Sequence, residues 1–256
     1  MNTVSSNRIQ KLEAGVRPLS TVLKALEIIE LFSNRSRPMR LSDVAKEMGL
    51  SRGTAFQRLV TLVSAGLLEQ DEDGRYRLSM YAVRLAAAAL EQANLGMRVE
   101  PALARLVSQA RETASLAVLD RGLPCIVARV ESDSLLRADQ KLGTMLSLDG
   151  SASGRVLVAF ADEVTLDRLR QGEFPLPPED VLEAARRNGY AVSSGYTQNG
   201  VRGIAAPVFD SLGRCHATVS LVTPEMRFNL DLLKAPVVNA AADITRIFHG
   251  EPLSDD

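Results

Sequence analysis

Histidine, cysteine and tryptophan are scarce in this 256-residue chain, and their scarcity limits the chemistry that it can carry. The sequence holds two histidines, His216 and His249, two cysteines, Cys125 and Cys215, and no tryptophan. This composition argues against most zinc sites and His-based catalysis, so we expect no metal and no cofactor. Two cysteines cannot build a disulfide framework and are typical of a reducing compartment, so we expect a cytoplasmic protein.

Long apolar runs are also missing. A membrane-spanning helix needs ~20 consecutive apolar residues, and the Ala-rich segment 85–90 is far shorter, so no membrane contact is expected. Residues 1–18 are polar and lack the apolar centre of a signal peptide, so we interpret them as a flexible arm. The chain is 46% hydrophobic and 24% charged, which is typical of a globular protein, and its length predicts two domains.

The common catalytic motifs are absent from the sequence. The run Gly150-Ser151-Ala152-Ser153-Gly154 places its second serine one residue too late for a Gly-x-Ser-x-Gly nucleophile turn. No Walker loop and no dinucleotide-binding fingerprint is present. His216 falls in a predicted strand with no nucleophile beside it, so we do not expect an enzyme.

The net charge of −1 conceals an uneven distribution. Residues 1–78 contain 12 Lys and Arg against 9 Asp and Glu, a net charge of +3, and the remaining residues carry −4. A basic N-terminal part on an acidic body favours an anionic partner for the first domain.

The N-terminal pattern predicts three helices and a hairpin. Ser20 or Thr21 is expected to cap a first helix, Ser42 a second, and Ser51 a third that spans 52–65 after a tight turn at Gly49. On a helical wheel of the third, one arc is apolar and contains Ala55, Phe56, Leu59, Val60, Leu62 and Val63. The other arc is polar and contains Thr54, Gln57, Arg58 and Thr61. Segments 67–70 and 75–78 flank Asp71-Glu72-Asp73-Gly74, a hairpin signal.

This order of elements predicts a winged helix-turn-helix over residues 19–79. The polar arc of the third helix would enter the major groove, where Gln and Arg read base edges. Arg75, Tyr76 and Arg77 on the hairpin would reach phosphates or the minor groove. Three arginines before the second helix, Arg35, Arg37 and Arg40, would hold phosphates from the other side. The alternative is a packing module whose polar arc only faces solvent.

Residues 80–96 predict a linker helix that is apolar almost all round. Tyr81, Val83, Leu85, Leu90 and five alanines leave Arg84 as the only charge between Met80 and Leu90. Such a helix must be buried on most sides, and we expect a second copy of the chain to cover it.

Residues 97–250 predict an α+β domain with an antiparallel sheet. Strands are expected at 115–120, 124–131, 203–209 and 215–222, with helices at 152–160, 163–170, 178–188 and 231–248.

Three segments resemble the IclR family of bacterial transcription regulators. They are LSDVAKEMGLSRGTAFQRLVTLVSAGLLEQDEDGRYRL at 41–78, KLGTMLSLDGSASGRVLVAF at 141–160 and RRNGYAVSSGYTQNGVRGIAAPVFDSLGRCHATVSLVTP at 186–224. The resemblance implies a winged-helix domain, a linker helix and a GAF-like effector-binding domain. It also implies a homodimer or a dimer of dimers that binds a near-palindromic operator in double-stranded DNA. Family members control catabolic operons in response to small organic or aromatic acids.

Two sets of site residues are expected: the DNA-binding set from the residue pattern together with the resemblance, and the effector-binding set as what the resemblance implies. DNA-binding residues would be Arg40, Ser42, Ser51, Arg52, Gly53, Thr54, Gln57, Arg58, Arg75, Tyr76 and Arg77. Effector-binding residues would be Met145, Leu146, Asp149, Gly150, Ser151, Ala152, Tyr196, Ile204, Ser220 and Val222.

The sequence departs from the family pattern in the effector-binding segments. Ser147-Leu148-Asp149 stands where Pro-Leu-His is usual, Arg155 replaces a lysine, and Ser220-Leu221-Val222 replaces Ser-x-Ser. An inward-facing Asp149 would repel an anion, so Ser151, Ser153 and backbone N–H groups would have to donate to the effector. Tyr196 offers a ring for stacking on an aromatic effector.

Two alternatives remain open for the second domain. It could serve only oligomerisation, or it could sense thiol redox state through Cys125 and Cys215 if their strands bring them together. Cys215 and His216 are neighbours on a predicted strand, so their side chains point to opposite faces and do not suit one metal ion.

Overall fold

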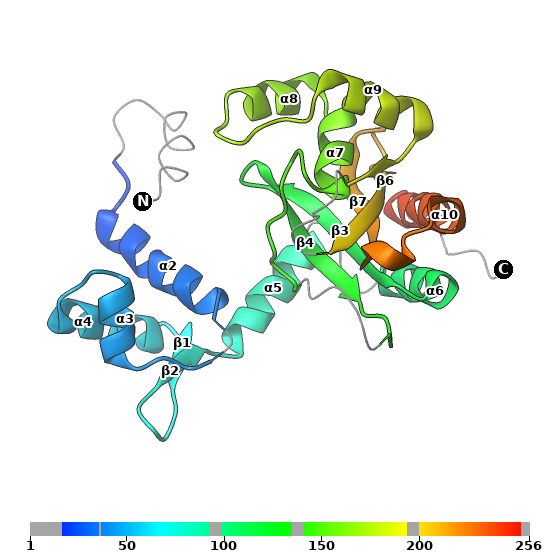
Figure 1. Ribbon diagram of the computed structural model, residues 1–256. Helices are drawn as coiled ribbons and strands as arrows, with labels where there is room; N and C mark the ends of the chain where they lie inside the picture. Colours follow the sequence, from blue (N-terminus) through cyan, green and yellow to red (C-terminus); the bar gives the residue numbers. More distant parts are fainter. Residues whose placement is uncertain (1–16, 36, 93–98, 135–140, 194–199, 252–256) are drawn as a thin grey trace. The chain divides into compact units, whose positions relative to one another are not determined.

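The computed structural model describes residues 17–35, 37–92, 99–134, 141–193 and 200–251 (Figure 1). The chain divides into two compact units, residues 1–92 and 93–256. The predicted arm at 1–18 lies almost entirely outside the described residues, and the predicted limits of the linker at 80 and 96 stay predictions. Among the described residues, no helix is both long and apolar enough to cross a membrane.

The first unit has the predicted order of helices followed by a hairpin. It contains α2 (Ser20–Ser33), α3 (Leu41–Glu47), α4 (Arg52–Ser64), β1 (Leu68–Gln70), β2 (Tyr76–Leu78) and α5 (Tyr81–Gln92). Its core gathers side chains from every element before α5: Ile28, Phe32, Met39, Val44, Leu59, Leu62, Leu68 and Tyr76. The winged helix-turn-helix prediction is confirmed at the level of these elements.

Local hydrogen bonds fix the start of α4. Ser51 Oγ accepts the backbone N–H of Thr54 at 3.1 Å, so the predicted Ser51 cap is confirmed. Gly49 takes a φ of +60° in the preceding turn, a left-handed conformation that glycine adopts without strain.

Two other predicted caps are wrong. The N-cap of α2 is Leu19, which has no side-chain cap, rather than Ser20 or Thr21. Ser42 lies inside α3, whose N-cap is Arg40, and the Asp43 carboxylate accepts the Arg40 backbone N–H at 3.3 Å. Asp43 therefore performs the capping that Ser42 was expected to perform.

The apolar arc of α4 is only half buried. Ala55, Leu59 and Leu62 lie in the core, whereas Phe56 is 51% exposed, and Val60 and Val63 are exposed as well. Only one narrow stripe of the apolar arc therefore packs on the core. The helix α5 has no buried residue, and Val83 and Leu85 are exposed. The second copy expected to cover α5 stays a prediction.

The second unit is built on a five-stranded antiparallel sheet in the order β4-β3-β7-β6-β5. The strands are β3 (Thr113–Asp120), β4 (Leu123–Val130), β5 (Ala191–Val192), β6 (Val201–Phe209) and β7 (Cys215–Pro224). The helices are α6 (Glu100–Ala110), α7 (Ala152–Ala159), α8 (Glu163–Arg170), α9 (Glu179–Asn188) and α10 (Leu230–Phe248), with a 3-10 turn at Glu225–Arg227. The predicted α+β domain with an antiparallel sheet is confirmed.

Helices cover both faces of this sheet. The helix α10 packs on β6, β7 and α6, whereas α7 packs on β6 and β7 from the other side (Figure 1). The pairing of the strands shows which side chains lie on the same face of the sheet. Directly paired residues share a face, and successive residues along a strand alternate between the two faces. Pairing places one row of residues on the α7 face across all five strands: Arg129, Ser115, Ser220, Ala205 and Ala191.

Candidate nucleic-acid interface and effector-binding face

The helix α4 presents a polar surface opposite its buried stripe. Arg52, Gly53 and Gln57 are exposed, and Thr54 and Arg58 are half-buried. Arg52 and Arg58 form no ion pair with any residue that the structure describes, so their guanidinium groups are available to another molecule. Such groups on a helix that fits the major groove can donate to base edges or to phosphates.

The hairpin offers two arginines to a nucleic acid. Arg77 Nε donates to Glu69 Oε1 at 2.7 Å, and Arg75 Nη2 lies 3.6 Å from Asp73 Oδ2. Both side chains are exposed, at 57% and 42%, so these pairs are weak and can exchange for phosphate contacts.

Tyr76 does not join these arginines on the surface. Its side chain is 3% exposed, and its backbone exchanges hydrogen bonds of 2.8 and 2.9 Å with Met39. The expectation that Tyr76 contacts DNA is wrong, because the alternation along β2 turns its ring into the core while Arg77 faces out.

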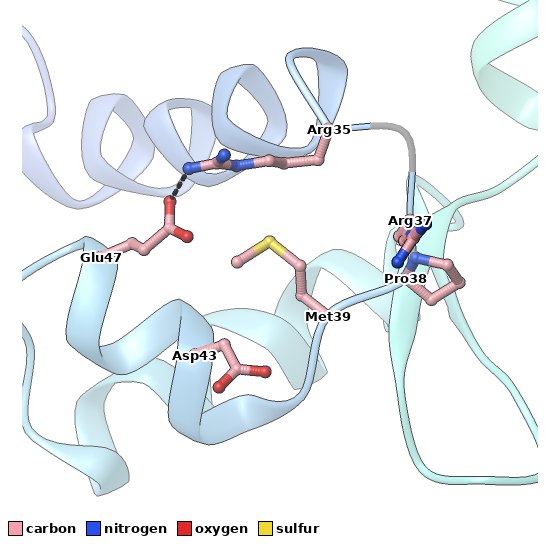
Figure 2. A pocket seen from close by; sticks show the side chains of 6 residues that line it. All are labelled: Arg35, Arg37, Pro38, Met39, Asp43 and Glu47. Carbon is pink, nitrogen blue, oxygen red and sulfur yellow. Dashed lines mark hydrogen bonds and ion pairs between the residues drawn. The ribbon is translucent and has the colours of Figure 1, made fainter.

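The arginines before α3 have different surroundings. Figure 2 shows Arg35 reaching from the end of α2 to Glu47 on α3, with which it forms an ion pair. Arg37 lies on the segment that leads into α3, beside Pro38 and Met39 (Figure 2). Both Arg37 and Arg40 are exposed. Arg37 and Arg40 are therefore better placed than Arg35 to contact a phosphate. Ser42 is exposed beside Asp43.

The loop 145–151, which the sequence predicts to contact the effector and which is called the effector loop below, is held by hydrogen bonds at both ends. Met145 bridges to Cys125 on β4, and Leu146 N donates to Pro124 O at 2.7 Å. At the other end, Gly150 N donates to Ser147 Oγ at 2.9 Å. Met145 is 40% exposed, and Leu146 and Gly150 are half-buried.

The hydroxyl of Ser151 makes two hydrogen bonds within the chain. It accepts the Gly154 backbone N–H at 2.9 Å as the N-cap of α7, and it donates to Ser147 O at 2.6 Å. The expectation that Ser151 donates to the effector is wrong, because its hydroxyl has one proton and already donates it to Ser147 O. Ala152, next to it, is buried against the sheet, with its Cβ facing Gly203.

Arg155 neutralises the charge of Asp149. Its Nε donates to Asp149 O at 2.6 Å, its Nη1 to Val192 O at 2.9 Å, and its Nη2 lies 3.6 Å from Asp149 Oδ1. Arg155 therefore ties the effector loop to β5. The predicted repulsion between Asp149 and an anionic effector is compensated by this pair.

Two of the expected strand residues face α7, and one does not. Ser220 lies opposite Ala205, and Val222 opposite Gly203, both on the α7 face. Ile204 lies between Gly203 and Ala205 and projects from the opposite face, toward α10. Ile204 therefore does not share a face with Ser220 and Val222, because a family motif does not reveal which alternate residues of a strand lie on the same side. Its role in effector binding stays a prediction. Tyr196 lies outside the described residues.

Sequence reasoning missed three polar residues of the α7 face: Ser115, Arg129 and Thr218. Thr218 pairs with Ala117 and Pro207, which places it on the same face as Ser115 and Ser220. Each is a polar residue in a largely apolar strand. The alternation of side chains along each strand could have indicated which face it occupies.

The two cysteines lie too far apart for a disulfide. Cys125 is on β4 and Cys215 on β7, with β3 between them, and both are free. Two strand spacings amount to roughly 10 Å, whereas bridged cysteines have Cα atoms within about 7 Å. Among the described residues, no group of three His, Cys, Asp or Glu side chains is arranged to hold a metal ion.

We expect Cys215 to be unreactive in the folded protein. Burial raises the pKa of its thiol to about 12, so only about one molecule in ten thousand carries the thiolate at pH 8. Mass spectrometry after brief iodoacetamide treatment at pH 8 should find Cys215 labelled only in denaturant. Rapid labelling of native Cys215 would instead support the redox alternative.

Comparisons with known proteins agree with this architecture. The family model described as "Bacterial transcriptional regulator IclR C-terminal" matches residues 87–246, and the model "IclR helix-turn-helix domain" matches residues 21–72. The chain is 32% identical to the glycerol operon regulatory protein of Streptomyces coelicolor over 204 residues, which cover 76% of this chain and 80% of that protein. It is 29% identical to the regulator XynR of Escherichia coli, over 80% of this chain and 86% of that protein.

Solved structures share the fold. A transcriptional regulator from Rhodococcus sp. RHA1 has a TM-score of 0.74 at 27% identity, over 91% of this chain and 99% of that one. An IclR homologue from Microbacterium hydrocarbonoxydans, complexed with 4-hydroxybenzoate, has a TM-score of 0.75 at 24% identity, over 90% of this chain and all of that one. The matched family models, together with the helix-turn-helix and the antiparallel α/β unit that follows it, establish that this chain belongs to the IclR family of bacterial transcription regulators.

Proposed function

We propose that this protein regulates a catabolic operon by binding a specific operator, and that a small organic or aromatic acid bound on the α7 face controls this binding. The observation that carries the proposal is the outer surface of α4. There, Arg52, Gln57 and Arg58 accompany a Ser51-capped first turn, and neither arginine pairs with a carboxylate in the described chain.

The DNA contacts divide into two kinds. Residues of α4 would read base edges in the major groove, while Arg37, Arg40, Arg75 and Arg77 would bind phosphates and make affinity fall with salt. A dimer joined through the exposed apolar side chains of α5 would present two α4 helices to a near-palindromic operator.

The ligand class rests on the second unit. A relative of the same fold binds 4-hydroxybenzoate, and in this chain Arg155 offsets the charge of Asp149 in the effector loop. An acid that binds one arrangement of the protein more tightly than another shifts the protein toward that arrangement. If this changes the affinity for the operator by some factor, operator DNA changes the affinity for the acid by the same factor. The alternative is a second unit that only oligomerises.

Thermal unfolding with candidate ligands separates these two functions. We expect at least one acid in a panel of benzoate, 4-hydroxybenzoate, lactate and acetate to raise the melting temperature, because a ligand at 100 times its Kd stabilises the folded state by about 2.7 kcal/mol. Scanning fluorimetry of the full chain measures the shift, with sodium chloride at equal ionic strength as the control. A panel without any shift would favour the oligomerisation alternative.

A further inference from the structure

A cluster of polar side chains lies on the α7 face, apart from the effector-binding residues that the sequence indicated. Arg129 on β4 and Ser115 on β3 are directly paired, and Thr218 on β7 is a diagonal neighbour of Ser115 on the same face. Paired side chains have Cβ atoms roughly 5 Å apart, and diagonal neighbours roughly 7 Å. A single small molecule can therefore contact all three.

Two hydroxyls of this cluster are buried and unsatisfied. Ser115 Oγ and Thr218 Oγ1 have no hydrogen-bond partner among the described residues, and the two residues are 1% and 0% exposed. Buried hydroxyls are nearly always hydrogen-bonded, because an unpaired one has lost its water without compensation. Two such groups on one face indicate a partner from outside the chain.

Arg129 adds a positive charge to the same place. Its side chain is 7% exposed, and its Nη1 lies 3.2 Å from Oε1 of Glu131, a side chain that is itself 49% exposed. A guanidinium stays charged at physiological pH, and its planar donors match the two oxygens of a carboxylate. This charge beside two hydroxyls favours an anionic ligand that carries further polar oxygens.

We propose that Arg129, Ser115 and Thr218 form the subsite that binds the carboxylate of the effector. This inference rests on the proposed function, because it assigns the residues that recognise the acid. Arg129 donates to the carboxylate, and the hydroxyls of Ser115 and Thr218 pair with its oxygens or with a neighbouring hydroxyl group. The Ser151 hydroxyl at the start of α7 does not supply this donor, because it already donates to Ser147 O.

The test compares Thr218→Val and Ser115→Ala with a matched control, Thr223→Val, in the full chain. Thr223 is also fully buried on β7, but it projects from the α10 face, and its Oγ1 is 3.3 Å from Pro224 O, within hydrogen-bond distance. Calorimetric titration uses benzoate and 4-hydroxybenzoate as probes, with lactate as an aliphatic acid and 4-hydroxybenzamide as the uncharged analogue.

We expect Thr218→Val and Ser115→Ala each to weaken acid binding about tenfold, and Thr223→Val to retain the wild-type Kd. Without ligand, neither subsite variant should lower the melting temperature, because each removes an unsatisfied hydroxyl. Arg129→Gln should abolish the preference for the acid over the amide.

Each contrary outcome has a distinct meaning. Wild-type affinity in both subsite variants, or amide binding as tight as acid binding in the wild type, overturns this subsite and leaves the proposed function intact. If the wild-type protein binds none of the acids, the subsite and the proposed effector class both fail.

Discussion

Replacing Arg58 or Arg52 with alanine should weaken binding to the operator roughly 10- to 100-fold, the value of one paired arginine–guanine contact. Both side chains lie on the outer surface of α4, and neither has a carboxylate partner among the described residues. Folding should be unaffected, because the Ser51 cap and the buried stripe of Ala55, Leu59 and Leu62 remain. Fluorescence anisotropy with labelled operator DNA measures the change in Kd, and thermal unfolding checks stability.

Lys24→Ala is a matched control for these two variants. Lys24 is an exposed cation on α2 in the same unit, so its removal changes the net charge equally without altering α4. If the arginines contact base edges, their removal should lower the affinity for operator DNA more than the affinity for scrambled DNA. If they contact phosphates, it should lower both affinities equally. Unchanged operator affinity in both arginine variants would refute the assignment of α4 as the recognition helix.

Gly154→Ala should disable the effector loop and destabilise the second unit by about 2 kcal/mol. A Cβ at Gly154 would lie 2.5 Å from Leu148 Cα, and closer still to the carbonyl oxygens of Ser147 and Leu148. Alanine favours a helix over glycine by up to ~1 kcal/mol, but this gain is smaller than the cost of moving backbone. The variant should lose the response to acid and melt at a lower temperature.

For Gly53→Ala, also a glycine-to-alanine change, we expect the opposite effect on stability. Gly53 lies in the first turn of α4, and an added Cβ there would meet nothing within 4 Å. The free energy of unfolding of the Gly53→Ala variant should therefore rise by about 0.5–1 kcal/mol. If Gly154→Ala also raised stability and kept the ligand response, the close packing of α7 against the loop would be disproved.

The elements of the fold were predictable because their signals are local. The segment 163–170 became α8 with the predicted limits, since Asp162 caps it through Thr165 N. The Asp71-Gly74 turn formed the hairpin, with the Asp71 carboxylate accepting the N–H groups of Asp73 and Arg75. These interactions join residues within four positions of each other, where sequence patterns are informative.

Apart from the two misplaced helix caps, the errors arose where distant segments meet. Alternation along β2 puts Tyr76 and Arg77 on opposite faces, but which of them is buried depends on the distant segment around Met39, to which Tyr76 bridges. Ser115 and Ser220 share a face because β3 and β7 pair across a hundred positions of sequence. The alternation of side chains within each strand was visible in the sequence. Which alternate residues of two strands lie on the same face depends on the register between the strands, and that register forms only in the folded sheet.

One measurement tests the central claim most directly: anisotropy titration of the full chain on DNA from its own promoter, and on scrambled DNA, at low and physiological salt. We predict that tight binding persists at physiological salt only for the promoter, and that an acid which raises the melting temperature shifts this curve. Failure to bind either DNA at low salt would contradict the account, because the arginines of α4 and the hairpin would then have no nucleic-acid partner.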